Sequence, residues 1–158
     1  MTDEVSTNEY SKDNSKFLWI GEHTNKEVQA LLLKFGYSPQ SSSIAQAHFL
    51  TGLRSFIKID TLSSTRLPGF KKNKRLFFPS FKWQDSDRST HVFVKLSTIR
   101  YFELLFKTIK LKKEARLWAK ENKEFKCNII IYSLHSPYLS LIPIFKKIIP
   151  NVQVTCIA

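Results

Sequence analysis

The sequence predicts an α/β fold, in which a Rossmann-like parallel sheet flanked by helices forms a single domain. Residues 127–133 form a continuous run centred on three isoleucines, as in strands that a parallel sheet covers on both faces. A helical segment and a second apolar run at residues 152–157 follow, which is the order of a parallel strand–helix–strand unit. The length of 158 residues suits one domain with its own core.

The first half of the chain predicts one strand followed by two helices. Residues 16–21 are a short apolar run that ends in glycine, which is typical of a buried strand entering a turn. Residues 25–35 carry apolar side chains at helical spacing, and Gly36 follows at the position of a C-cap. Residues 43–53 indicate a second helix, for which a run of three serines offers the N-cap.

The second half predicts two further strands and two further helices. Residues 55–62 alternate in polarity, which predicts a strand that is half exposed. Residues 63–88 show no period and predict a long loop, and residues 91–96 predict another strand. Residues 99–122 repeat apolar side chains at steps of three and four, which predicts the longest helix. Residues 138–149 predict a helix interrupted by a proline.

The ends of the chain and its cysteines bear on location. Residues 1–15 are polar and predict a disordered tail, so we expect the domain to span residues 16–158. They lack the apolar segment of a secretory signal. Cys127 and Cys156 are isolated and have no metal or redox spacing, as in the reduced interior of a cell. The apolar run at residues 129–145 contains a histidine and two prolines, which argues against a membrane span. We therefore expect a cytoplasmic protein.

The charge balance points to a polyanionic partner. The chain has 25 lysines and arginines against 13 aspartates and glutamates, a net charge of +12. Such a field favours nucleic acid, an anionic membrane surface or phosphate-bearing ligands. The alternative is that an AT-rich genome raises the lysine content without functional meaning.

Two loops are candidates for a binding site, because ligands of open parallel sheets lie beyond the carboxyl ends of the strands. These loops are residues 21–24 and residues 135–137. His135 is the strongest candidate, since an imidazole there can donate to a sugar hydroxyl or a phosphate, or act as a base. The alternative is a histidine that caps the local backbone. Gly21 also has a structural explanation in the tight turn between strand and helix.

Other chemical motifs are missing from the sequence. There is no glycine-rich dinucleotide loop, Walker loop or GxSxG element, and the four histidines (His23, His48, His91 and His135) have no metal-ligand spacing. Asp85 and Asp87 indicate a turn and not a catalytic pair. We therefore expect neither a cofactor nor a metal.

A basic and aromatic segment lies inside the predicted loop. Four cations are followed closely by four aromatic side chains, a mixture that suits single-stranded nucleic acid or a membrane interface. The alternative is an ordinary solvated loop. The cations are Lys71, Lys72, Lys74 and Arg75, and the aromatic residues are Phe77, Phe78, Phe81 and Trp83.

Several stretches taken together resemble the N-terminal half of a bacterial GT-B-fold glycosyltransferase of the family-four type (glycosyl transferases group 1). The resemblance covers nearly all of residues 16–158. The stretches are FLWIG at residues 17–21, SIAQAHFLTGL at 43–53, LWAKEN at 117–122, IIIYSLHSPY at 129–138 and PNVQVTCI at 150–157.

This resemblance implies an acceptor-binding domain that often rests on the inner membrane surface. In such enzymes a C-terminal domain holds the nucleotide-sugar, and transfer occurs in the cleft between the two domains. We expect a sugar or lipid-linked sugar acceptor to contact His135, Ser136, Gly21 and Glu22. The family usually has a glycine pair where this chain has Gly21 and Glu22, and it continues past residues 152–157 into an acidic, proline-containing loop. We therefore expect a truncated domain that is inactive alone.

Two other functions remain open on the sequence. The net charge and the basic segment favour a nucleic-acid-binding module, whose affinity would fall with salt and with neutralisation of Lys71, Lys72, Lys74 and Arg75. The third possibility is a non-catalytic subunit that completes its cleft with a separately encoded glycosyltransferase half.

Overall fold

A computed structural model describes residues 15–68 and 76–158 of the chain. The predicted tail at residues 1–15 therefore lies outside the described residues, apart from its last position. The basic cluster of Lys71, Lys72, Lys74 and Arg75 lies outside them as well.

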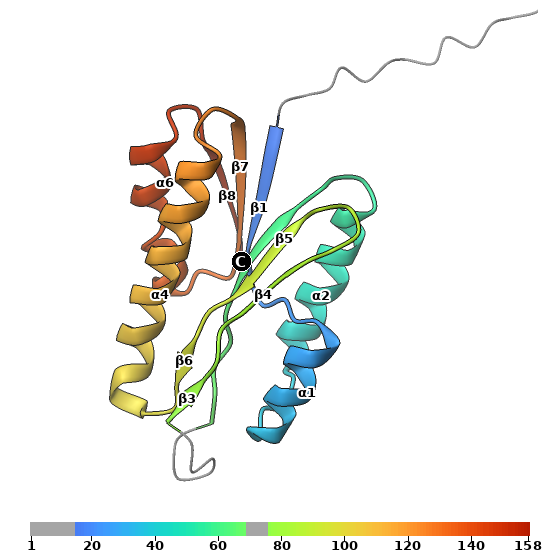
Figure 1. Cartoon of the computed structure of the whole chain (residues 1–158), viewed down its shortest axis with the longest axis vertical. Coiled ribbons are helices and arrows are strands. Elements are labelled where there is room, and N and C mark those ends of the chain that lie inside the picture. Colours follow the sequence, from blue (N-terminus) through green and yellow to red (C-terminus); the bar gives the residue numbers. More distant parts are fainter. Residues whose placement is uncertain (1–14, 69–75) are drawn as a thin grey trace, which may run out of the picture.

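The predicted α/β class and the Rossmann-like sheet are confirmed (Figure 1). Among the described residues, six strands form one sheet in the order β4-β5-β2-β1-β7-β8, and β4 alone is antiparallel to its neighbour. A separate antiparallel pair joins β3 to β6. The strands are β1 (Ser15–Gly21), β2 (Asp60–Ser63), β3 (Phe77–Phe78), β4 (Phe81–Gln84), β5 (Thr90–Phe93), β6 (Leu96–Ser97), β7 (Lys126–Tyr132) and β8 (Gln153–Ile157).

Helices lie on both faces of the sheet. In Figure 1, α4 and α6 lie on one side, and α1 and α2 lie on the other. The buried face of α4 packs Leu111, Ala115 and Ala119 into the larger core. On the opposite face, Trp19, Leu50 and Ile59 form a smaller core. The helices are α1 (Lys26–Lys34), α2 (Ser41–Arg54), α4 (Arg100–Glu121), α5 (Ser136–Leu139) and α6 (Ile142–Ile148).

Local sequence explains the ends of α1 but not the start of α2. The Asn25 side chain accepts a 2.8 Å hydrogen bond from the Val28 N–H, which caps α1. Gly36 adopts a φ of 74° just beyond the helix, as a C-terminal glycine does. The predicted serine cap of α2 is wrong, because Gln40 is the N-cap and makes no side-chain hydrogen bond. The three serines form the first turn of the helix.

Two predictions for the middle of the chain are wrong. The half-exposed strand at 55–62 is confined to Asp60–Ser63, where all residues but the first are buried. Phe56, which suggested the alternation, lies in the turn after α2 and is almost fully exposed. The predicted loop at 63–88 contains β3 and β4. β3 has two residues, and β4 places lysine between aromatic residues, so neither shows an extended run of apolar side chains.

The C-terminal unit has the predicted parallel strands, but its details differ. The helix predicted at 138–149 is divided into α5 and α6, and Pro143 lies in the first turn of α6, where no backbone N–H is needed. The strand predicted as buried, β8, pairs only with β7 among the described residues and is largely exposed. Cys156 on β8 is exposed, whereas Cys127 on β7 is buried, and both thiols are free.

The longest predicted helix is confirmed as α4, with one difference. Tyr101 and Leu104, which belong to the predicted core stripe, are exposed. None of the helices in the described ranges has the length and apolar character that crossing a bilayer requires.

Candidate functional site

The carboxyl ends of three neighbouring strands meet at one edge of the sheet. Gly21 at the end of β1 pairs with Ser63 at the end of β2, and Ile20 of β1 pairs with Ile131 of β7. The two predicted loops, after β1 and after β7, therefore leave adjacent parallel strands at the same edge. This edge is where ligands bind in open α/β sheets.

Polar side chains from the β1 loop, the β2 loop, the segment between α1 and α2, and α5 form an "edge cluster", defined by Glu22, Tyr37, Ser64, Thr65 and Tyr138. Both carboxylate oxygens of Glu22 are engaged: Thr65 Oγ1 donates to one at 2.5 Å, and the Tyr37 hydroxyl donates to the other at 3.1 Å. The Tyr138 hydroxyl donates to the Ser64 carbonyl at 3.0 Å and lies 2.8 Å from Ser64 Oγ. Tyr138 thus reaches from the β7 loop across the end of β1 to the β2 loop.

Burial determines the protonation of the two phenols in this cluster. It raises the pKa of Tyr138 far above its usual value, and it also raises the pKa of Tyr37. Both phenols therefore stay protonated near neutral pH, and both can donate hydrogen bonds.

Lys107 of α4 also reaches the edge cluster, which the sequence reading missed. Its ammonium group donates to the Thr65 carbonyl at 3.4 Å. Burial lowers its pKa, the charges of Glu103 and Glu22 oppose that shift, and Arg66 adds to it. The position of Lys107, three residues after Leu104 and four before Leu111, is a signal that it lies on the stripe facing the sheet.

His135 and Ser136 lie at the start of α5 with exposed side chains. The His135 carbonyl accepts hydrogen bonds from the N–H groups of Tyr138 and Leu139, at 3.0 and 3.1 Å, whereas its imidazole makes no capping bond. Ser133, just before this loop, has a φ of 80°, a conformation that few non-glycine residues adopt. The backbone shapes this loop, and its contact with a ligand stays a prediction.

Gly21 has a packing reason to be glycine. A Cβ at this position would lie 2.6 Å from Gln46 Oε1 and 2.8 Å from Trp19 Nε1. Gln46 also accepts a 2.8 Å hydrogen bond from the N–H of Glu22. The protein's own side chains therefore fill the space beside Gly21, while Glu22 lies in the edge cluster.

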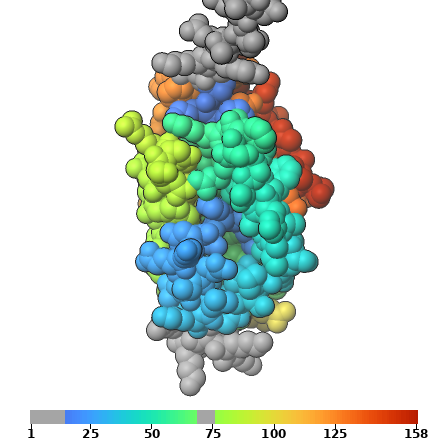
Figure 2. Space-filling model, turned by 90° about the vertical axis from the view of Figure 1, so that its right-hand side faces the viewer, coloured from blue at the N-terminus to red at the C-terminus, as the bar shows by residue number. Residues whose placement is uncertain are grey.

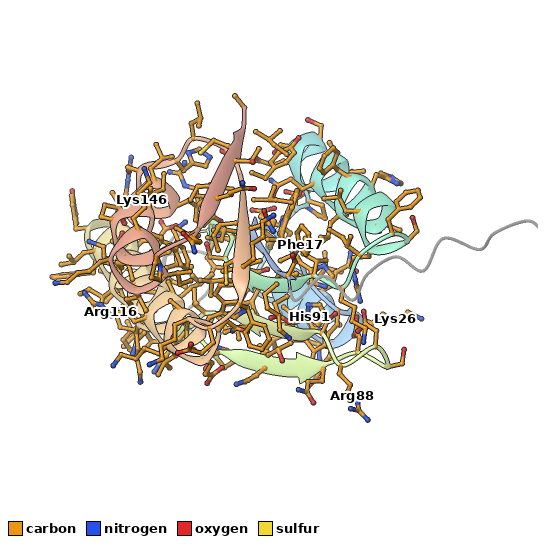
Figure 3. The ribbon with its side chains drawn as sticks, turned by 90° about the horizontal axis from the view of Figure 1, so that it is seen from above. Phe17, Lys26, Arg88, His91, Arg116 and Lys146 are labelled. Atoms are coloured by element: carbon orange, nitrogen blue, oxygen red, sulfur yellow. The ribbon has the colours of Figure 1, made fainter. Side chains whose placement is uncertain are left out.

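A second polar group, the "histidine cluster", lies on the α2 side of the sheet and consists of His23, Arg54, Asp85 and His91. Arg54 forms an ion pair with Asp85, and His91 Nε2 lies 3.1 Å from the same carboxylate. The rings of His23 and His91 are 5.0 Å apart. Figure 3 shows His91 inside the domain, between the sheet and the helices.

The histidine cluster holds neutral imidazoles. Burial lowers the pKa of His23 to about 4, and the charges of His91 and Arg54 act in the same direction. Burial also lowers the pKa of His91, although Asp85 opposes the shift. The predicted turn is correct, because Asp87 accepts a hydrogen bond from the Ser89 N–H, but Asp85 also joins the hairpin to α2. No run of sequence could indicate a cluster drawn from four separate elements. No group of three or more metal-ligand side chains within 15–68 and 76–158 could hold a metal ion.

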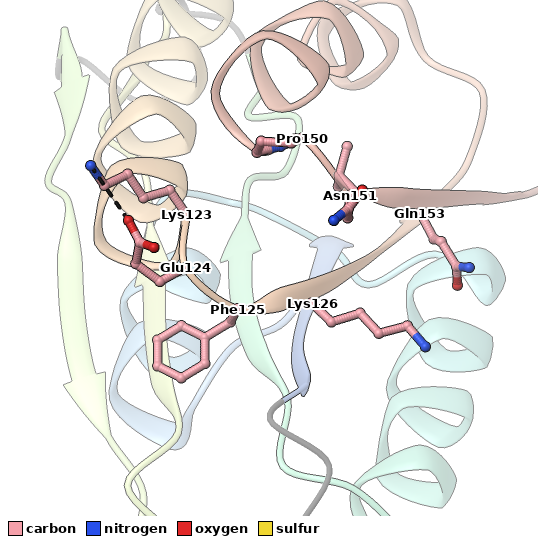
Figure 4. Close-up of a pocket in the computed structure, with 8 residues that line it drawn as sticks. Lys123, Glu124, Phe125, Lys126, Pro150, Asn151 and Gln153 are labelled. Atoms are coloured by element: carbon pink, nitrogen blue, oxygen red, sulfur yellow. Dashed lines mark ion pairs between the residues drawn. The ribbon is translucent and has the colours of Figure 1, made fainter.

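A surface pocket of about 540 Å³ lies at the opposite edge, where β7 and β8 begin (Figure 4). Lys123 and Glu124 form a 3.6 Å ion pair on its rim. This is the amino edge of the parallel strands, away from the edge cluster. Figure 2 shows the side that carries α1 and α2, where the surface dips between the blue α1, the aquamarine α2 and the lime-coloured β4–β5 hairpin.

Comparison with known proteins adds no relative. No protein family, curated protein or solved structure matches this chain.

Proposed function

We propose that this chain is the acceptor-binding half of a glycosyltransferase that uses a nucleotide-sugar donor in the synthesis of cell-surface polysaccharide or another glycan. The observation that carries the proposal is the edge cluster at the carboxyl ends of β1, β2 and β7. The resemblance of several stretches within residues 16–158 to the acceptor domain of GT-B enzymes is the sequence argument for it.

The chemistry of the edge cluster suits a sugar or a lipid-linked sugar. Sugar hydroxyls both donate and accept hydrogen bonds, and the cluster offers a carboxylate, hydroxyls and an ammonium group within one contact network. Lys107 has three N–H donors, of which one points to Thr65, and it can also contact a phosphate. His135 and Ser136 are exposed beside Tyr138, where an acceptor can reach them without rearrangement of the core.

We propose that the donor nucleotide-sugar is bound by a domain other than the one that carries the edge cluster. In our proposal a C-terminal domain binds the nucleotide-sugar and closes the cleft over the acceptor. The 158-residue chain alone should bind acceptor sugars but should not transfer them. A reading frame that continues beyond Ala158 into a second Rossmann-like domain would support this proposal. We place the enzyme in the cytoplasm, peripheral to the inner membrane face.

The test is a titration of the ¹⁵N-labelled chain, followed by NMR, with monosaccharides, sugar 1-phosphates and UDP-glucose. We expect the acceptor-type ligands to shift the amide signals of Glu22, Ser64 and Tyr138, and UDP-glucose to have little effect. Glu22→Gln and His135→Ala should weaken the response. The matched control is His48→Ala, because His48 is an exposed histidine on α2, away from the edge cluster. Shifts confined to the amino-edge pocket, or no shifts at all, would contradict the proposal.

The net charge of +12 keeps nucleic-acid binding as a second candidate. It predicts binding of a fluorescent single-stranded oligonucleotide that weakens steeply between about 50 and about 200 mM salt. Neutralising Lys71, Lys72, Lys74 and Arg75 together should remove that binding.

A non-catalytic subunit would instead co-purify with a separate glycosyltransferase half, and the sugar titration would then give shifts only in the complex.

A further inference from the structure

The first turns of α4 carry an unusual group of exposed apolar side chains. We name them the "α4 tip": Tyr101, Phe102, Leu104, Leu105 and Ile109, with Leu76 and Phe77 beside them. Tyr101 is 91% exposed, and Phe102 and Leu105 are each 59% exposed. Monomeric soluble proteins rarely leave a contiguous apolar group of this kind in water, so the α4 tip calls for a partner.

The position of the α4 tip explains why its side chains are exposed. In Figure 1 the lower part of α4 extends past α6, and of the described elements β3 and β6 lie beside it. Tyr101 and Leu104 lie on the stripe that continues into the buried Leu111 and Ala115, but at this end the stripe is exposed. Phe77 packs on Phe106 at 5.6 Å between ring centres, which joins the strand pair to the helix.

Cations surround this apolar surface. Lys95 lies over the Phe77 ring at 4.7 Å, and Lys110 lies over the Phe106 ring at 5.2 Å. The outward stripe of α4 changes along its length from apolar to basic. It consists of Phe102, Leu105 and Ile109, followed by Lys113, Arg116 and Lys120. The whole helix has seven basic and three acidic residues.

The positive charge around the α4 tip distinguishes between the possible binding partners of this surface. A second copy of this chain would bring two basic surfaces together, which is unfavourable. An anionic bilayer accepts aromatic and aliphatic side chains at the boundary between headgroups and acyl chains, and its headgroups attract the lysines around them. Lysine stems can lie along aromatic rings while their ammonium groups reach the phosphates.

We propose that the α4 tip is a membrane-docking surface that inserts Tyr101, Phe102 and Leu105 into the interface of an anionic lipid bilayer. Because α4 begins at the carboxyl edge of the sheet, docking by its tip brings that edge toward the membrane surface. The proposal uses only the described residues of this surface and does not depend on sugar transfer.

The experiment is flotation of the full chain with vesicles of phosphatidylglycerol and phosphatidylcholine, or of phosphatidylcholine alone, at about 150 mM salt. We expect binding to the anionic vesicles only. The double variant Phe102→Ser/Leu105→Ser should lose about tenfold or more in partitioning, since it removes two apolar side chains from the interface. Both residues are exposed, and circular dichroism with a thermal unfolding scan would check that the variant folds.

The matched control is Phe56→Ser, which removes an 87% exposed phenylalanine outside the α4 tip and should leave the partitioning unchanged. Three results would overturn the proposal: no flotation with anionic vesicles, equal flotation of the wild type and the double variant, or a loss in Phe56→Ser as large as in the double variant. If the wild type does not float with vesicles but forms a dimer in light scattering, and only the double variant disrupts this dimer, the α4 tip serves self-association instead.

Discussion

On the side of the sheet covered by α4, α5 and α6, the strands present Leu18, Ile20, Ile129 and Ile131, all buried among apolar neighbours. On the α2 side, β1 and the strands β2, β5 and β4 next to it present a row of larger and more polar side chains. Paired residues across four strands form that row: Trp83, His91, Thr61 and Trp19. One face is therefore stabilised by the burial and close packing of hydrocarbon, and the other combines a smaller apolar core with specific pairs between polar groups.

The polar face is incompletely paired. In the described part of the chain, Trp19 Nε1 and Ser63 Oγ are buried without a hydrogen-bond partner. An unpaired buried group costs free energy, whereas an apolar contact has no such requirement. Substitutions on the apolar face should therefore act through cavities, and those on the polar face should depend on charge, on shape and on the partner of each atom.

The largest effect should come from the apolar face. Phe145 of α6 is fully buried and meets Trp118 edge to face, with ring centres 6.2 Å apart. Phe145→Ala should lower the free energy of unfolding by about 3–5 kcal/mol, because it removes buried area and leaves a cavity. Urea denaturation at neutral pH measures this loss in the free energy of unfolding. The control is Lys146→Ala on the same helix, which should change stability by less than about 0.5 kcal/mol. Similar losses in the two variants would contradict the apolar account of this face.

Shape should decide the next effect, at the junction of the polar face with the edge cluster. Gly21→Ala would place a methyl group within 3 Å of both Gln46 Oε1 and Trp19 Nε1, so that one of these side chains must move. We expect a loss of about 1–3 kcal/mol in the free energy of unfolding. Gly52 of α2 is the control, because a Cβ there meets no atom within 4 Å. Gly52→Ala should be neutral or stabilising, since alanine favours a helix. A neutral Gly21→Ala would mean that the space is open to a ligand.

Charge should make the polar face sensitive to pH. The pKa of His23 is about 4 in the folded chain and about 6.5 when unfolded, so below pH 6.5 the unfolded chain takes up a proton that the folded chain does not. Stability should therefore fall as the pH decreases from 6.5 toward 4, by about 2 kcal/mol between about pH 7.5 and about pH 5 from His23 alone. The carboxylates with lowered pKa, Asp85 and Asp87, lose their contribution only at lower pH.

Urea denaturation at the two pH values tests this dependence. His23→Phe keeps a ring beside His91 and removes the titration, so it should reduce the loss between the two pH values. His48→Phe changes an exposed histidine and should leave the loss unchanged. An equal pH dependence in wild type and His23→Phe would show that His23 does not set it.

The apolar face was the part of the fold that the sequence could predict. The strand β7 contains a run of apolar residues, and α4 repeats apolar residues at helical spacing, and local patterns detect both kinds of burial. The short strands β3 and β4 were missed, because pairing with β6 and β5 stabilises them and no local pattern marks them. The exposure of β8 was missed for a related reason: an apolar run does not say how many neighbours a strand has.

For the candidate site, the sequence could predict the location at the sheet edge but not the set of residues. The rule for parallel sheets correctly brought the loops after β1 and β7 to one edge, since those strands are neighbours. Glu22 lies in one of these loops, but the other four members of the edge cluster lie outside them, and only contacts in space connect Tyr138 to Ser64 or Lys107 to Thr65. The sequence could not reveal the partner of each polar atom.

The smallest effects should come from two adjacent serines that differ only in partner. Ser63 and Ser64 are both fully buried, but Ser64 Oγ contacts the Tyr138 hydroxyl, whereas Ser63 Oγ has no partner among the described residues. Ser64→Ala should lower the free energy of unfolding by about 1 kcal/mol, because it leaves Tyr138 with one contact fewer. Ser63→Ala should be neutral or slightly stabilising, because it removes an unpaired hydroxyl from the interior. Urea denaturation of both variants under one set of conditions measures the difference. If Ser63→Ala costs as much as Ser64→Ala, the Ser63 hydroxyl has a partner, such as a bound water, and the α2 side of the sheet is better paired than its side-chain contacts indicate.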